Sequence, residues 1–127
     1  MRPLGRHIII DLYDCRPEAI GDCEGVERAM VGAAEDMGAN VVCVEFHHFE
    51  PQGVSGTVVI SESHLTIHTW PEYDFAAVDI FTCADDVDPE RAIERLKKEF
   101  EPDCVEMSDL ARGDREELEA RRAKLEG

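Results

Sequence analysis

Apolar residues along the chain follow two periods, and these predict a sheet with helices packed against it. Short alternating or β-branched runs predict five strands, over residues 7–12, 40–49, 54–61, 64–70 and 75–83. Apolar residues spaced three and four apart predict helices over 22–37 and 88–100. This order predicts one domain over residues 1–127. We expect an α+β fold: a two-layer α/β sandwich with a mostly antiparallel sheet and helices on one face.

Cap and turn signals set the ends of these elements. Asp22 can cap the first helix and Gly38 ends it, while Asp88 precedes a proline at the start of the second helix. Residues 13–21 read as a loop. We expect a short edge strand at 104–107 and a charged, peripheral helix at 114–126.

The strand at 64–70 carries an unusual set of side chains on one face. Alternation sends Leu65, Ile67 and Thr69 to one side of the strand. The other side receives His64, Thr66, His68 and Trp70. Because helices are expected on one face only, the second face is left open. A second copy of the chain could cover it, so we expect a homodimer.

The turns between strands fix which residues lie opposite one another. If residues 71–74 close a hairpin, Trp70 faces Phe75. If Glu62 and Ser63 themselves form the preceding turn, Ser55 faces Trp70 and lies one pair from His68. This register predicts one patch of sheet that gathers four polar residues, namely Ser55, Ser63, His68 and Cys83.

Charge and cysteine content narrow the class of protein. The chain holds 29 acidic and 13 basic residues, a formal net charge of −16, which argues against nucleic acid and anionic membranes as partners. The five cysteines show no zinc-binding spacing, and Cys15, Cys23 and Cys43 read as small buried apolar residues. Without a signal peptide or a long apolar segment, we expect a cytoplasmic protein with reduced thiols.

The predicted patch admits three kinds of chemistry. A hydrolase would use Ser63 or Cys83 as nucleophile and His68 as base, but there is no GxSxG elbow. A metal site could be built from histidines, but the carboxylate or cysteine spacing that would make it specific is missing; the candidates are His47, His48, His64 and His68. The third possibility is that the chain cleaves itself.

Self-cleavage needs a hydroxyl on a tight connection, a base, and a polar group that steadies the oxyanion. Ser63, His68 and Ser55 could fill these three roles. Attack on the preceding carbonyl converts the Glu62–Ser63 amide to an ester, and elimination followed by hydrolysis leaves a pyruvoyl group. That ketone forms a Schiff base with an amine and accepts electrons during decarboxylation. Cys83 is a suitable proton donor.

The segment SGTVVISESHLTIHTWPEYDFAAVDIFTC, residues 55–83, closely resembles the signature of the short, homodimeric prokaryotic S-adenosylmethionine decarboxylases. The likeness runs from about residue 7 to 83 and more loosely to residue 100, whereas the charged tail after Asp109 has no strong counterpart. The resemblance implies a proenzyme that cleaves at Glu62–Ser63 into chains 1–62 and 63–127. Ser63 would become the pyruvoyl cofactor, and no metal is implied.

The resemblance also assigns residue roles. His68 and Ser55 match processing residues, and Cys83 matches the proton donor. Phe49, Trp70 and Glu72 match positions around the substrate, where aromatic rings would hold the adenine and the acid would hold the ribose hydroxyls. The implied reaction is decarboxylation of S-adenosylmethionine to the aminopropyl donor for spermidine, in a homodimer of cleaved protomers.

Two alternatives share these processing residues. Relatives of the same fold use the same pyruvoyl chemistry to decarboxylate arginine or ornithine, and the retained Phe49, Trp70 and Glu72 favour the nucleoside substrate over them. A non-catalytic homologue acting as a dimeric partner is disfavoured by the presence of Ser63, His68 and Cys83.

Overall fold

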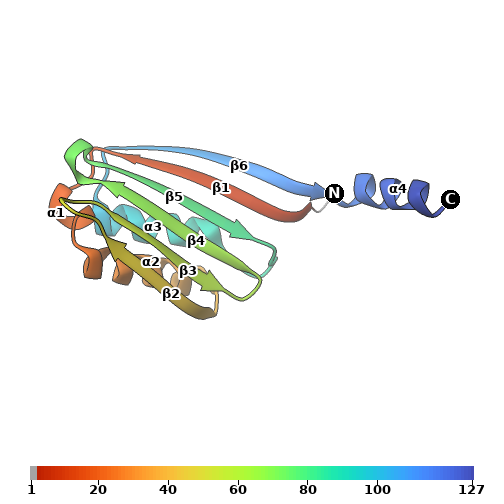
Figure 1. Ribbon diagram of the computed structural model, residues 1–127, viewed down its shortest axis with the longest axis horizontal. Helices are drawn as coiled ribbons and strands as arrows, with labels where there is room; N and C mark the ends of the chain where they lie inside the picture. The colour runs from red at the N-terminus through yellow and green to blue at the C-terminus, as the bar shows by residue number, and fades with distance from the viewer. Residues whose placement is uncertain (1–2) are drawn as a thin grey trace.

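The computed structural model describes residues 3–127, and within them six strands form one antiparallel sheet (Figure 1). The strand order across the sheet is β2-β3-β4-β5-β1-β6. The strands are β1 (Pro3–Tyr13), β2 (Val41–His48), β3 (Val54–Ile60), β4 (Ser63–Trp70), β5 (Phe75–Thr82) and β6 (Cys104–Asp114). The predicted α+β architecture with an antiparallel sheet is therefore confirmed.

Helices cover one face of the sheet and leave the other face open (Figure 1). The covering helices are α1 (Pro17–Ile20), α2 (Cys23–Asp36) and α3 (Pro89–Phe100), and a 3₁₀ turn, η1 (Pro71–Tyr73), links β4 to β5. Apolar side chains from the sheet meet those of α2 and α3 in one core, which includes Ile10, Val26, Leu65, Ile80 and Leu96. Their burial is the main stabilising term of the fold.

Thr69 shows how a polar residue is accommodated on the buried face of β4. Its side chain is buried, and Oγ1 accepts a hydrogen bond from the Val54 amide at 2.9 Å. The same hydroxyl donates to the carbonyl oxygen of Ile20 at 2.8 Å. The hydroxyl is therefore satisfied, and it ties the end of α1 to the centre of the sheet.

Three sequence predictions need correction. The expected loop at 13–21 contains the short helix α1, which begins at a proline, a residue that favours the first helical turn. The strand expected at 104–107 extends to Asp114, because it pairs with β1 along its whole length. Alternation over residues 40–49 predicts Val42 on the same face as Val44 and Phe46. A register shift between Val41 and Cys43 instead leaves Val42 exposed, and Val41 packs on the core.

The cysteines divide between core and surface. Cys15 is buried as predicted and Cys23 is partly buried, but Cys43 is exposed. Cys43 is exposed because it neighbours Val44, which packs on the core, so alternation directs Cys43 to the open face of β2. Among the helices of the described residues, none is long and apolar enough to cross a membrane.

Burial raises the pKa of the Cys15 thiol from 9.0 to about 11, with smaller contributions from Asp14 and Asp74. Because the thiol has a higher pKa in the folded state than in the unfolded state, it contributes fully to stability only at a pH below the unfolded pKa. As the pH rises from the unfolded pKa through the folded pKa, this contribution is lost. We expect the free energy of unfolding to fall by about 2 kcal/mol between pH 9 and pH 11 on this account. Urea titrations at pH 8 and pH 11 measure it.

A Cys15→Ala variant is expected to lose this part of the pH dependence, whereas Cys104→Ala, which removes an exposed thiol, should keep it. If the free energy of unfolding falls equally for Cys15→Ala and Cys104→Ala between pH 8 and pH 11, the buried thiol does not cause the pH dependence.

Beyond the last β1–β5 pair, Arg6 with Thr82, the chain forms a projecting two-stranded arm. This arm consists of Pro3–Gly5 paired with Arg112–Asp114. It leads into α4 (Arg115–Glu126), which extends away from the body (Figure 1). Asp114 caps α4 by accepting hydrogen bonds from the amides of Glu116 and Glu117. The predicted charged, peripheral helix is confirmed.

Candidate active site

The connection between β3 and β4 is a two-residue turn of Ser61 and Glu62, closed by the pair Ile60 and Ser63. Glu62 has a φ of 66°, in the left-handed region that disfavours residues with a side chain. Such a conformation costs about 1 kcal/mol or more. Backbone strain is therefore stored at the residue whose carbonyl carbon belongs to the Glu62–Ser63 bond.

Ser63 begins β4, and its hydroxyl lies against the backbone of its own turn. The hydroxyl donates to the carbonyl oxygen of Glu62 in a short contact. The backbone amide of Cys83, at the end of β5, donates to Ser63 Oγ at 2.9 Å. Two neighbouring strands thus hold the hydroxyl beside the one peptide bond that self-cleavage would break. Cys83 is exposed here and presents its thiol at the same end of the sheet.

Ser55 and His68 form a second group at the other end of β4. They are direct cross-strand partners, and Ser55 Oγ lies 2.8 Å from His68 Nδ1. The sequence-based register placed Ser55 opposite Trp70, which is wrong by two residues. The reason is the turn, which uses Ser61 and Glu62 and leaves Ser63 in the strand. A shift of two residues keeps the same face, so Ser55 still meets His68.

The two groups do not form one patch within a single chain, contrary to the prediction. Five residues of extended strand separate Ser63 from His68, which corresponds to about 17 Å. Odd and even positions of β4 also point to opposite faces: Leu65 and Ile67 are buried, while His68 is exposed on the open face. His68 therefore lies out of reach of Ser63 in the same chain.

The three predicted substrate residues all lie at the His68 end. The Trp70 ring lies 6.3 Å from the His68 ring, and the Phe49 ring lies 4.5 Å from the ring of His47. Trp70 and Phe49 are 40% and 47% exposed, so both rings can contact a ligand. Glu72 follows within η1 and is also exposed.

The structure confirms Phe75 beside Trp70 and adds Tyr13, an aromatic residue that the sequence did not indicate. Phe75 is the direct partner of Trp70 with ring centroids 5.6 Å apart, and Tyr13 lies 5.2 Å from Phe75. The Tyr13 hydroxyl donates to Glu106 at 2.9 Å, and this hydrogen bond raises the pKa of Tyr13. Tyr13 reaches the site through the pairing of β1 with β5, which is long-range in sequence and carries no local signal.

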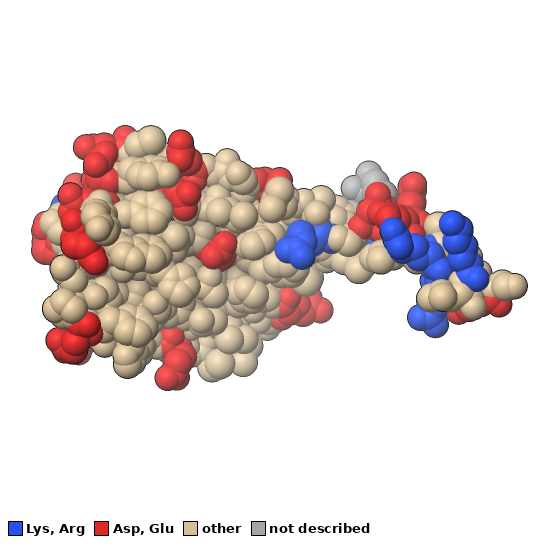
Figure 2. Space-filling view, turned by 45° about the horizontal axis from the view of Figure 1, so that its top comes forward, with Lys and Arg blue, Asp and Glu red and all other residues tan. Residues whose placement is uncertain are grey.

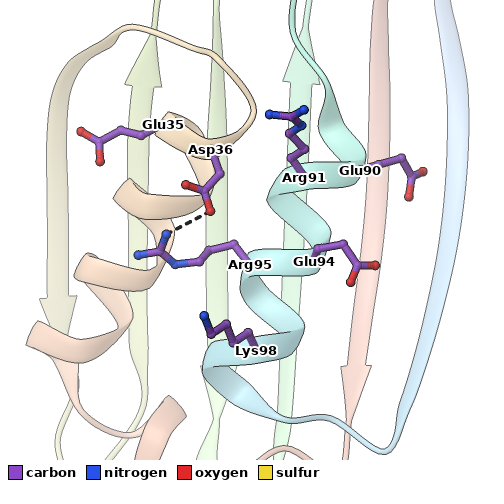
Figure 3. A pocket seen from close by; sticks show the side chains of 7 residues that line it. All are labelled: Glu35, Asp36, Glu90, Arg91, Glu94, Arg95 and Lys98. Carbon is purple, nitrogen blue, oxygen red and sulfur yellow. Dashed lines mark hydrogen bonds and ion pairs between the residues drawn. The ribbon is translucent and has the colours of Figure 1, made fainter.

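A separate hollow of about 660 Å³ lies between α2 and α3 on the helical side (Figure 3). Arg95 reaches across it and donates to Asp36 at 3.0 Å. Charged side chains from both helices line it, namely Glu35, Asp36, Glu90, Arg91, Glu94, Arg95 and Lys98. Since the sheet lies between this hollow and the open face, it is separate from the Ser55–His68 pair.

Of the histidines weighed as metal ligands, His47 and His68 flank Ser55 across neighbouring strands. His48 lies 3.9 Å from Glu50, and the His64 ring stacks on Phe81. Within residues 3–127, no group of three His, Cys, Asp or Glu side chains has the arrangement of a metal site.

The fold defines the class, an α+β protein with one open sheet face and a serine hydroxyl against the carbonyl oxygen of a strained turn. Comparison with known proteins makes this specific. The family model for S-adenosylmethionine decarboxylase matches residues 6–113. The chain belongs to the S-adenosylmethionine decarboxylase family.

Individual relatives agree with this assignment. A protein of Thermosipho melanesiensis named S-adenosylmethionine decarboxylase proenzyme is 53% identical over 118 residues, 93% of this chain and 91% of the relative. One of the same name from Methanococcus maripaludis is 46% identical, covering 89% and 93%. The crystal structure of the adenosylmethionine decarboxylase of Aquifex aeolicus matches with a TM-score of 0.83 and 30% identity, covering 90% of this chain and 94% of that one.

Proposed function

We propose that this protein is a pyruvoyl-dependent decarboxylase of S-adenosylmethionine, made as a proenzyme that cleaves itself between Glu62 and Ser63. The observation that carries the proposal is the Ser63 hydroxyl held between the Glu62 carbonyl oxygen and the Cys83 amide. The names of the relatives favour this substrate over arginine or ornithine. The product would serve as an aminopropyl donor for spermidine.

Self-cleavage follows from the groups around Ser63. Its oxygen attacks the carbonyl carbon of Glu62, the peptide C–N bond breaks, and the nitrogen of Ser63 takes up a proton to become an amine. The acyl group of Glu62 is then an ester on Ser63 Oγ. A base removes the α-proton of Ser63, the Cβ–Oγ bond breaks, and Glu62 leaves as a carboxylate, so that Cα and Cβ become doubly bonded. Cβ takes up a proton, water adds to Cα, and the nitrogen leaves as ammonia, so residue 63 becomes a pyruvoyl group.

A homodimer brings His68 to Ser63, which it does not reach within one chain. Ser63 lies at one end of the sheet, and the Ser55–His68 pair lies at the other end, on the open face. If a second copy covers this face with its strands running end over end, that is, in the opposite direction, the end of each sheet that carries Ser63 meets the end of the other sheet that carries the partner's His68. His68 then removes the proton, and Ser55 holds its ring through the 2.8 Å contact and steadies the oxyanion. One dimer would carry two such shared sites.

The open face has the composition of an interface rather than of a solvated sheet. Partly buried apolar side chains such as Ile9, Val59 and Phe81 alternate with a polar cluster. In that cluster His7 Nε2 lies 3.0 Å from Asp79, and Thr66 donates to the same carboxylate at 3.3 Å. Satisfied polar groups of this kind can be buried against a partner at low cost.

The substrate would lie where the two groups meet. Phe49 and Trp70 offer ring faces to a purine and to a sulfonium cation, and Glu72 offers a carboxylate to ribose hydroxyls. The formal charge of −16 favours approach of a cationic substrate. The surroundings of Ser63 fit formation of a pyruvoyl group at this residue. That group would supply an electrophilic ketone to accept the electron pair released when CO2 leaves.

Cys83 is the proposed proton donor to the carbon that loses CO2. Cys83→Ala keeps the backbone amide that contacts Ser63, so we expect self-cleavage to continue. Decarboxylation should fall about 10²–10⁴-fold, the usual contribution of a positioned acid. Cys104→Ala, the matched exposed thiol, should leave the rate unchanged. A normal rate of CO2 release and normal product from the cleaved Cys83→Ala enzyme would remove Cys83 from this role.

The substrate assignment is tested by release of labelled CO2. The purified, cleaved enzyme is offered carboxyl-labelled S-adenosylmethionine, arginine or ornithine in parallel at equal concentration. We expect release from S-adenosylmethionine alone. Release from an amino acid instead would show that the site keeps pyruvoyl chemistry but serves the alternative substrate.

A further inference from the structure

The projecting helix α4 has two unlike faces. Leu118 and Leu125 lie seven residues apart, on one side of the helix, and Leu125 is 87% exposed. Helical spacing places three arginines around these leucines: Arg115, Arg121 and Arg122. The opposite side holds small and acidic residues, namely Glu116, Glu119, Ala120 and Ala123. One side of α4 is therefore apolar, with a rim that holds these arginines. Arg121 and Arg122 are paired along the helix with Glu117 and Glu126.

Within residues 3–127, this face stays exposed. Every residue of α4 is exposed, and the helix meets the body only through the arm (Figure 1). A twelve-residue helix without tertiary packing is marginally stable in water, even with its cap and its Glu117–Arg121 pair. A leucine face on such a helix is typical of a surface that is covered in the assembled protein.

At the far end of the sheet lies a recess of complementary character. Four aromatic side chains line about 380 Å³ of mostly apolar space, namely Tyr13, Trp70, Tyr73 and Phe75. Acidic residues adjoin each part of it: Asp14 follows Tyr13, Glu106 binds the Tyr13 hydroxyl, and Glu72 and Asp74 flank Tyr73. The recess is an apolar surface with an acidic rim.

The charge distribution separates these two surfaces on the molecule. Figure 2 shows acidic side chains around the end of the body away from the arm, and basic side chains together with acidic ones on the arm and α4. α4 holds four basic and four acidic residues, so the acidic excess lies elsewhere in the chain. Arginine binds carboxylates and stacks on aromatic rings, so the arginines beside the leucines of α4 are complementary to the acidic and aromatic residues of the recess.

The same chain cannot bring the two surfaces together. The arm leaves the sheet at the Ser63 and Cys83 end, whereas the recess is built on the Trp70 and Phe75 end. The arm and α4 add about 28 Å beyond the sheet, from three residues of strand and twelve of helix. In a dimer with strands end over end, the arm and α4 of one protomer extend past the recess of the second copy.

We propose that α4 of one protomer docks on the recess of the second copy, with Leu118 and Leu125 against the aromatic side chains and the arginines against the acidic rim. The proposal rests on the homodimer of the proposed function. The docked helix forms an outer wall beside Trp70 and Glu72, so it covers one side of each shared site.

Trp70 is the only tryptophan of the chain and reports directly on the recess. The test compares acrylamide quenching of its fluorescence in the full chain, in Leu118→Asp and in a chain ending at Asp114. We expect quenching to rise about twofold in both altered chains, because the indole becomes accessible when the helix leaves. Ala120→Asp adds the same charge on the opposite face and should quench like the full chain.

Sedimentation at the same protein concentration separates the possible failures. A monomeric full chain would overturn both the dimer and the docking. A dimer in which Leu118→Asp, Ala120→Asp and the full chain quench alike would overturn the docking and leave the dimer standing. Protection of Trp70 by S-adenosylmethionine without any effect of α4 would mean that the substrate occupies the recess, which also overturns the docking.

The ionic part of the contact is tested with the double variant Arg121→Glu and Arg122→Glu. We expect its quenching to match that of Leu118→Asp at low salt. In the unaltered chain, quenching should rise with ionic strength, because salt screens exposed ion pairs. Quenching that is independent of both salt and the arginines would contradict the proposed pairing of the rims.

Discussion

A Ser63→Ala chain is expected to remain one uncleaved polypeptide, whereas the unaltered chain separates into two under denaturing conditions. Alanine removes the one hydroxyl that contacts the Glu62 carbonyl oxygen. Without it no ester can form, so we expect loss of both cleavage and decarboxylation. A denaturing gel after prolonged incubation measures the first, and labelled CO2 release measures the second.

Ser61→Ala is the matched control, since Ser61 is an exposed serine in the same turn two residues earlier. We expect Ser61→Ala to cleave normally. Cleavage of Ser63→Ala at the same peptide bond, or failure of both variants, would show that the turn is cut in another way or that the substitutions disturb the fold.

Restoration of cleavage in mixed dimers is the second prediction with a large expected effect. Ser63→Ala and His68→Ala chains should each remain uncleaved when expressed alone. When they are expressed together, the His68→Ala chain should be cleaved, because its Ser63 meets the histidine of the other chain. The expected change is from no detectable cleavage to cleavage of that chain in the purified mixed dimer, measured by mass.

The pair His68→Ala and Ser55→Ala provides the control for this experiment. Ser55 and His68 belong to the same end of the sheet, so every shared site in that mixed dimer lacks one of them. We expect no restoration. If the purified mixed dimer of Ser63→Ala and His68→Ala stays uncleaved, the end-over-end arrangement is wrong.

Much of the sheet could be predicted because its signals are local. Alternation along β4 assigns Leu65 and Ile67 to the core and His68 to the open face, as the structure has them. The hairpin at η1 fixes Trp70 opposite Phe75, which is also confirmed. Both rest on strand period and turn length, and these depend on neighbouring residues alone.

The errors come from backbone geometry that side-chain pattern does not specify. Which two residues form the β3–β4 turn depends on a left-handed φ at Glu62, a conformation that the glutamate itself disfavours. The extension of β6 to Asp114 depends on pairing with a strand about a hundred residues away. Tyr13 and Phe75 likewise meet through long-range pairing.

The division of the site into two ends has the same origin. Ser63 and His68 are close in sequence, and the sequence alone suggested that they share one patch. In an extended strand, however, five residues span about 17 Å, so proximity in sequence does not become proximity in space. The positions of the strands are therefore needed to infer that Ser63 and His68 meet only across two copies of the chain.

The most direct test of the central claim is the mass of the unaltered, freshly denatured protein. We predict two chains, one ending at Glu62 and the other beginning with residue 63 at the mass of a pyruvoyl group, one ammonia lighter than a chain that begins with serine. A single full-length chain that persists after long incubation would contradict self-cleavage. Two chains that begin with an unmodified serine would contradict formation of the cofactor.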